Sequence, residues 1–203
     1  MGRSSVIVVG ELKSNFNMDC CNGSSEKKNS PPIRDSLQFY VNDKKIEVPP
    51  STISSVTTLG HYLRRNLHLT GTKLSCEQGG CGSCSVLMSS KESNQFVAVN
   101  SCLISIASCD GFRIKTVEGI NDQVVPQRLA KFNGSQCGFC SPGMVMAMES
   151  LRINGKPFTK NDVEKLLDGN ICRCTGYRPI LDSFKSLVEN NTETIPIKDI
   201  EDF

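Results

Sequence analysis

Residues 76–84 read Cys-Glu-Gln-Gly-Gly-Cys-Gly-Ser-Cys, and another cysteine, Cys102, follows 18 positions after the last of them. Three cysteines in one glycine-rich loop with a fourth downstream have the spacing of plant-type [2Fe–2S] sites. Such a cluster needs two thiolates per iron, so the segment has to curl around it, and glycines permit the backbone angles and close amides that this requires. Zinc sites favour CxxC pairs instead. The loop therefore predicts a [2Fe–2S] cluster bound by Cys76, Cys81, Cys84 and Cys102.

A second set of cysteines lies near the C-terminal end, as Cys137-x2-Cys140 and Cys172-x-Cys174. Both pairs precede expected helix starts, where the helix dipole favours a thiolate over a thiol. The spacing alone fits a zinc ion with four thiolates as well as an iron–sulfur cluster. A thioredoxin-like redox pair is disfavoured, because the expected βαβ context is missing.

Composition excludes several classes of protein. The 203 residues suffice for one ordinary domain or two small ones, and the 38% apolar content without Trp favours two compact ones. A net charge of +2 implies no strongly basic face, which argues against a nucleic-acid partner. The 11 cysteines are an odd number and fit a closed disulfide framework poorly, so we expect them to bind metal.

The N-terminus and the hydropathy indicate a cytoplasmic protein without a membrane partner. The apolar run Val6–Val9 is far shorter than a signal-peptide core. No stretch approaches the roughly 20 apolar residues that span a bilayer. A reduced cytoplasmic location agrees with cysteines that serve as metal ligands.

Periodicity divides the chain into a mixed first half and a helical second half. Alternation predicts a hairpin over 37–48 with its turn at Asn42–Asp43, and Thr57 is expected to cap a helix that follows. Strands are expected at 85–88, 96–99 and 112–117, and helices over 124–132, 141–151, 160–168 and from Pro179. Thr159 with Asp162 is expected to form a capping box at the start of the helix over 160–168. The expected divisions are a flexible tail at 1–35, a first domain at 36–117, a linker at 118–123, a helical domain at 124–190 and a tail at 191–203.

The remaining candidate residues receive structural interpretations. Cys20 and Cys21 are expected to be spare thiols in the tail, and Cys109, among apolar residues, a buried structural thiol. We assign surface roles to His61 and His68. The stripe of Met144, Met146 and Met148 is interpreted as helix packing, partly in the core and partly at the surface.

Three motifs in this order resemble the iron–sulfur part of the molybdenum hydroxylases, the family of xanthine dehydrogenase and aldehyde oxidase. They are the 76–84 loop, Gln-Cys-Gly-Phe-Cys-Ser-Pro-Gly at 136–143 and Asn-Ile-Cys-Arg-Cys-Thr-Gly-Tyr-Arg-Pro at 170–179. The resemblance implies an α+β protein, with a ferredoxin-like β-grasp domain followed by an all-helical four-helix domain. It implies a second [2Fe–2S] cluster, with Cys137, Cys140, Cys172 and Cys174 as its ligands, and it places Gln136 and Cys174 next to molybdopterin.

The resemblance also implies a function, in which the chain relays electrons from a molybdenum centre to FAD through two clusters as part of an oxidoreductase. FAD and molybdopterin are expected on other domains or subunits, in a complete enzyme that is a dimer. The chain is then either a separate subunit or a piece of a longer chain. A free-standing ferredoxin-like carrier and a zinc-bound interaction module are the alternative hypotheses.

Overall fold

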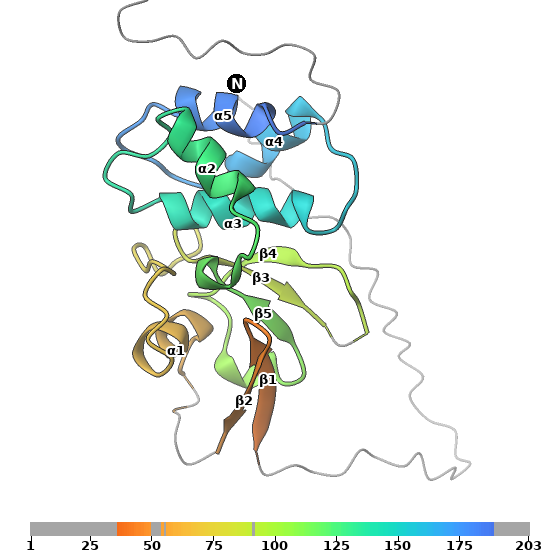
Figure 1. The fold of residues 1–203 in the computed structure, drawn as a ribbon. Coiled ribbons are helices and arrows are strands. Elements are labelled where there is room, and N and C mark those ends of the chain that lie inside the picture. Colours follow the sequence, from red (N-terminus) through yellow and green to blue (C-terminus); the bar gives the residue numbers. More distant parts are fainter. Residues whose placement is uncertain (1–35, 50–53, 55, 91, 189–203) are drawn as a thin grey trace, which may run out of the picture. The chain divides into compact units, whose positions relative to one another are not determined.

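The computed structural model describes residues 36–49, 54, 56–90 and 92–188 (Figure 1). The predictions for the two tails, including those for Cys20 and Cys21, lie outside these residues. The described part is a mixed α+β structure with one five-stranded sheet and five α-helices. No helix in this part is long and apolar enough to cross a lipid bilayer.

The strands form a sheet with the order β2-β1-β5-β3-β4. β1 and β5 pair in parallel, whereas the other neighbours are antiparallel. The hairpin turn at Asn42 and Asp43 has φ values of 49° and 65°, which are the left-handed angles that a two-residue turn needs, and the predicted hairpin is confirmed. The strands are β1 (Leu37–Val41), β2 (Lys44–Val48), β3 (Ser85–Ser89), β4 (Val97–Asn100) and β5 (Arg113–Lys115).

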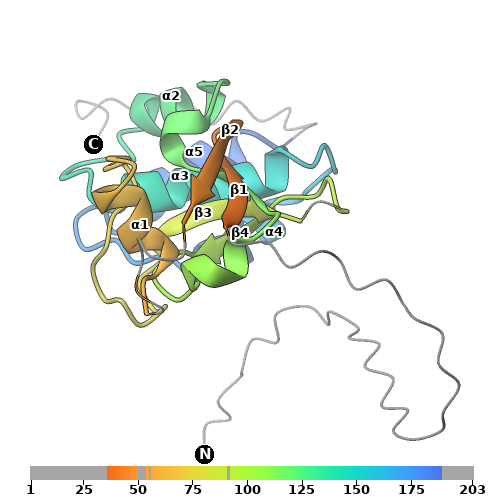
Figure 2. The ribbon, with the colours of Figure 1, turned by 90° about the horizontal axis from the view of Figure 1, so that it is seen from below.

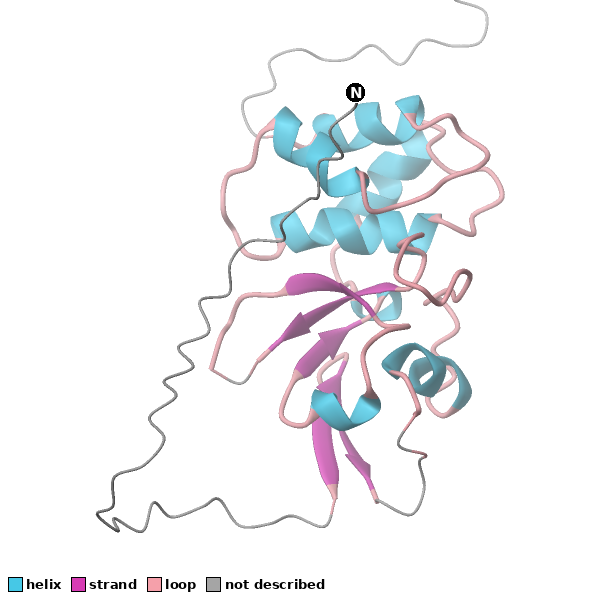
Figure 3. Cartoon of the chain, turned by 180° about the vertical axis from the view of Figure 1, so that it is seen from behind, coloured by secondary structure: helices cyan, strands magenta, loops and turns pink. Residues whose placement is uncertain are grey.

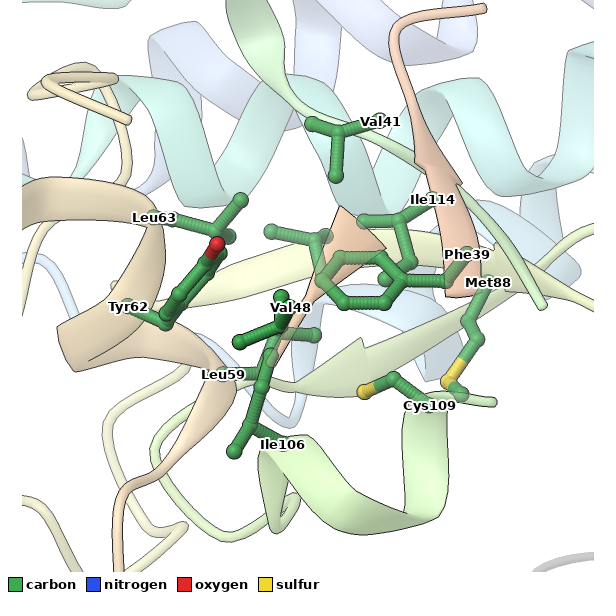
Figure 4. Close-up of a cluster of buried hydrophobic side chains, with 11 residues drawn as sticks. Phe39, Val41, Val48, Leu59, Tyr62, Leu63, Met88, Ile106, Cys109 and Ile114 are labelled. Carbon is green, nitrogen blue, oxygen red and sulfur yellow. The ribbon is translucent and has the colours of Figure 1, made fainter. Parts of the chain in front are cut away.

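The helix α1 (Leu59–Arg65) flanks the sheet (Figure 2). The predicted cap is wrong by one residue, because Thr58 rather than Thr57 is the N-cap. Thr58 has an extended backbone, and its side chain accepts a hydrogen bond from the His61 amide. One hydrophobic cluster joins this helix to the sheet, and Figure 4 shows Phe39 among its side chains. Cys109 is fully buried in this cluster, which confirms its structural interpretation, and burial raises the pKa of its thiol to about 12.

Four further helices follow the sheet in sequence. α4 begins with the predicted capping box, in which Thr159 and Asp162 satisfy each other's backbone amides. The short 3-10 helix η3 (Val117–Gly119) precedes these four helices in sequence. It contains the first residues of the stretch that we expected to be a linker. The helices are α2 (Val124–Lys131), α3 (Ser141–Arg152), α4 (Lys160–Leu167) and α5 (Arg178–Lys185).

α3 lies between the sheet on one side and α2, α4 and α5 on the other (Figures 1 and 3). Met144 and Met148 pack in the helical core, whereas Met146 packs with Leu87 and Phe96 of the sheet region. All three methionines are at most 1% exposed. The expectation that this stripe is partly at the surface is therefore wrong, because both faces of the helix are covered.

Candidate metal centres

The first set of cysteines lies on the loop between α1 and β3 and on the segment after β4. Cys76 and Cys81 are partly exposed, whereas Cys84 and Cys102 are buried. The Ser101 side chain donates to the Cys84 carbonyl at 2.7 Å, and the Ser101 amide bonds the same oxygen. These two hydrogen bonds to one carbonyl hold Cys84 close to Cys102, which follows Ser101 directly.

The loop directs backbone amides at the sulfur of Cys76. The Gln78 amide donates to its Sγ at 3.4 Å, and this bond, with smaller contributions from the Cys81 side chain and the Gly80 amide, lowers the pKa of Cys76 to about 7. Burial has the opposite effect on Cys84 and raises its pKa to about 12, opposed by the Cys102 amide and aided by the Cys102 side chain. Amides that stabilise negative sulfur are what an anionic cluster requires from its protein.

The glycines of this loop have separate roles. Gly79 and Gly82 have φ values of +78° and +68°, which favour glycine. A Cβ at Gly80 would meet nothing within 4 Å, so a side chain at this position would face open space.

Several residues that support the loop are absent from the sequence-based prediction. Asn100 donates from Nδ2 to the Gly79 carbonyl at 2.9 Å. His61, which we assigned to the surface, is partly buried, with Nδ1 3.0 Å from the Thr58 hydroxyl and Nε2 3.6 Å from the Glu77 carboxylate. Glu77 has a φ of 53°, which is uncommon for a side chain other than glycine. No sequence pattern marks the contacts of Asn100 with Gly79 and of His61 with Glu77, because they join residues of different segments.

The second set lies at the start of α3 and on the segment before α5. Cys140 is the N-cap residue of α3, as expected, whereas Cys174 precedes the first residue of α5 by four positions. The Cys172 amide donates to the Tyr177 hydroxyl at 3.0 Å, and its sulfur lies 3.1 Å from the Thr175 hydroxyl. This turn is therefore held by its own side chains.

Side-chain contacts divide this set into two pairs, Cys137 with Cys174 and Cys140 with Cys172. The Phe139 amide, and then the Cys174 side chain, lower the pKa of Cys137. Burial, aided by Cys172, raises the pKa of Cys140 to about 12. Cys76 with Cys81 and Cys84 with Cys102 make the corresponding pairs of the first set.

The donor sets fit a binuclear cluster. Each set offers two pairs of thiols, and a [2Fe–2S] cluster takes two thiolates on each of its two irons. The amides that lower the pKa values of Cys76 and Cys137 fit an anionic group such as a cluster with inorganic sulfide.

The two residues that the resemblance places beside molybdopterin both adjoin or belong to the second cysteine set. Gln136 and Cys174 are both exposed. Gln136 immediately precedes Cys137, whose side chain contacts Cys174. The two residues therefore lie at the exposed end of the second set.

Comparison with known proteins agrees with this geometry. Residues 39–109 match the 2Fe-2S iron-sulfur cluster binding domain, and residues 116–185 match the [2Fe-2S] binding domain. The chain thus contains two iron–sulfur domains, each with one of the cysteine sets. It is also similar in structure to quinoline 2-oxidoreductase from Pseudomonas putida 86, with a TM-score of 0.65 and 30% identity over 75% of this chain and 91% of that one.

Curated relatives match more than three quarters of the chain. Aldehyde oxidase 4 from Cavia porcellus is 46% identical over 78% of this chain, and xanthine dehydrogenase/oxidase from Mus musculus is 46% identical over 77%. The chain spans about 12% of the length of these relatives. The aldehyde oxidoreductase from Desulfovibrio gigas is 30% identical over 74% of this chain, with a TM-score of 0.64. The chain belongs to the iron–sulfur portion of the molybdenum hydroxylase family, which comprises the xanthine dehydrogenases and aldehyde oxidases.

Proposed function

We propose that this chain is the electron-transfer module of a molybdenum hydroxylase. In this proposal Cys76, Cys81, Cys84 and Cys102 hold one [2Fe–2S] cluster, and Cys137, Cys140, Cys172 and Cys174 hold the other. When bound, the clusters supply one-electron chemistry and connect a molybdenum centre with FAD, both carried by other domains or subunits. The halves of the chain would be a ferredoxin-like β-grasp domain and a four-helix domain.

One observation carries the proposal, namely that the two cysteine sets lie on segments that touch. The Ile171 amide, next to Cys172, donates to the Cys81 carbonyl at 2.9 Å. A short distance between the two sites suits a relay, whereas two independent structural metal sites would not need this contact. The chain's own residues would position the sites, bury part of each and direct amides at the sulfurs, which are the means by which a protein tunes a cluster.

Exposed apolar side chains beside the second set favour a docked module over a free-standing ferredoxin-like carrier. Phe139 and Ile171 are 44% and 55% exposed. Each adjoins one member of the contacting pair Cys140 and Cys172. Apolar groups exposed beside a redox site are typical of a surface that a partner covers. The proposed partners are the flavin and molybdopterin domains or subunits, within a dimeric cytoplasmic enzyme.

The test is the metal content of the purified chain. We expect four irons and four acid-labile sulfides per chain, with a visible absorption spectrum and no zinc. Cys81→Ser and Cys172→Ser should each remove the signal of one cluster and leave the other, whereas Cys109→Ala should keep both. Iron near two per chain, or zinc at the second set, would contradict the proposal.

A further inference from the structure

Two asparagine side chains cross from the helical half of the chain to the sheet half. Asn154, just after α3, receives the Phe96 amide on Oδ1 at 2.9 Å and donates from Nδ2 to the Phe96 carbonyl at 2.8 Å. Asn170 donates from Nδ2 to the Gly82 carbonyl at 3.1 Å, across 88 positions of sequence.

The two contacts lie at opposite ends of α3. Gly143, in the first turn of α3, lies against Gly82, whereas Asn154 follows the last turn. The 12 residues of α3 correspond to a length of about 18 Å at 1.5 Å per residue. The Asn170 contact therefore lies near the end of α3 that is close to the cysteines, and the Asn154 contact lies at the opposite end.

The Asn170 contact joins the two cysteine sets directly. Gly82 lies between Cys81 and Cys84, and Asn170 lies two residues before Cys172. Asn170 is only 6% exposed, and the next amide along, that of Ile171, donates to the Cys81 carbonyl. Two consecutive residues of one metal-binding segment thus bond two consecutive carbonyls of the other.

The two segments are too closely packed at Gly82 to accept a side chain there. A Cβ at Gly82 would lie 2.4 Å from the side-chain Nδ2 of Asn170 and 2.4 Å from the Gly169 carbonyl oxygen. Gly82 also has a φ of +68°. A glycine is therefore needed for the two segments to approach. The Gly82 carbonyl accepts from the amide and the hydroxyl of Ser85, and Asn170 adds a further hydrogen bond to it from the other segment.

We infer that Asn170 is a positioning residue, which fixes the two metal-binding segments relative to each other through the Gly82 carbonyl. The inference rests on the proposed function insofar as both segments hold clusters. The linker and the remote Asn154 contact keep the halves joined, but they do not set the spacing of the two sites. Asn170 itself needs no contact with either cluster to do this.

The test uses the 203-residue chain loaded with both clusters, in three variants. Asn170→Ala removes the side chain, and Asn170→Asp keeps its shape but replaces the donor with an acceptor that repels the Gly82 carbonyl. Asn154→Ala is the matched control, because it breaks two bonds between the same halves far from the cysteines. The primary readout is the magnetic interaction between the two reduced clusters in electron paramagnetic resonance, which depends steeply on their separation.

We expect both Asn170 variants to keep full iron content but to lose or weaken the splitting due to this interaction, while Asn154→Ala retains it. Amide hydrogen exchange of Ile171 should be about tenfold faster in both Asn170 variants, the size expected when one buried hydrogen bond is lost. It should be unchanged in Asn154→Ala at equal global stability.

Three results would overturn the inference. The first is an unchanged splitting in both Asn170 variants. The second is an equal loss in Asn154→Ala, which would make the effect one of general stability. The third is a loss of iron from the Asn170 variants alone, which would make the residue necessary for assembly of the site. If the unmodified chain holds no iron, the proposed function fails, and the exchange rate of Ile171 still tests the contact between the segments.

Discussion

Gly143 in the first turn of α3 lies directly against the backbone of Gly82 in the loop of the first cysteine set. A Cβ at Gly143 would come within 2.3 Å of the Gly82 carbonyl oxygen and 3.0 Å of the Ser83 Cα. This close approach lets α3, whose N-cap is Cys140, pack against the loop that contains Cys81. Helix and loop are thereby packed backbone to backbone.

Gly143→Ala tests which of two effects dominates at this position. Alanine in place of glycine inside a helix stabilises it by about 1 kcal/mol on propensity alone. Overpacking against a backbone that cannot move costs about 1–3 kcal/mol, so we expect a net loss of stability. Thermal unfolding followed by circular dichroism should show a midpoint lower by several degrees. Gly169→Ala, with open space around its Cβ, should have little effect, and a raised midpoint for Gly143→Ala would contradict the packing.

Gly82→Ala should be more severe than Gly80→Ala in the same loop. A side chain at the φ of Gly82 costs about 1–2 kcal/mol, and the contacts with Asn170 and Gly169 add to this. Gly80 has open space and serves as the matched control. We expect Gly82→Ala to lower both the thermal midpoint and the visible absorbance of the purified chain. Equal behaviour of the two variants would show that the close approach is not needed.

Glu149 makes stability depend on pH. It lines a cavity of about 200 Å³ with Lys115, Asp122 and Arg152, its side chain is 7% exposed, and its Oε1 has no hydrogen-bond partner. Burial raises its pKa above the ordinary 4.5, although Arg152, 3.5 Å away, opposes this. Between the ordinary and the raised pKa the folded chain holds a proton that the unfolded chain has released. This contribution to stability is therefore lost as the pH rises through the raised pKa.

Glu149→Gln removes this proton linkage. We expect the thermal midpoint of the variant, relative to the unmodified chain, to rise as the pH increases from the ordinary pKa of 4.5 through the raised one, because only the unmodified chain then buries a charge. Glu92→Gln, at an exposed position, should show a constant difference over the same range. A constant difference for Glu149→Gln would mean that its carboxyl titrates normally.

Removal of the metal should unfold part of the helical half. Two thiol pairs join the start of α3 to the segment before α5, and regular secondary structure is absent from 168–177. Metal that binds only the folded chain adds its binding energy to stability. Far-ultraviolet circular dichroism of the chelated chain should therefore show less helix than the loaded chain. Cys172→Ser should show a similar loss, and unchanged helicity in both would refute the dependence.

Gln136→Ala addresses the proposed contact with molybdopterin in the complete enzyme. Gln136 is exposed beside the contacting pair Cys137 and Cys174, so it is free to hold a neighbouring group in register. We expect slower reduction of the clusters by substrate in stopped-flow absorbance, with iron content intact. Gln127→Ala, exposed on α2, is the control. An unchanged rate of reduction, or a loss of iron, would contradict a positioning role.

Features formed by residues that are close together in the sequence could be predicted from the sequence alone. The spacing of the first cysteine set predicted one iron–sulfur site, whereas the second cluster was implied by the resemblance of the three motifs to a known family, and the family comparisons support two iron–sulfur domains. Asn42 and Asp43 predicted the hairpin turn, and Thr159 with Asp162 predicted the start of α4. These features were readable because the residues that interact are close in sequence, so that spacing alone specifies the geometry.

Contacts between distant segments were decided only by the tertiary structure. The burial of Met146 depends on the sheet, which covers the second face of α3. The bond from Asn170 to Gly82 joins residues 88 positions apart, and no periodicity marks it. The cysteine pairs likewise depend on how the chain brings remote segments together. Periodicity reports the burial of one face of one element, whereas these features arise where two elements meet, and their energies depend on distances that only the folded chain sets.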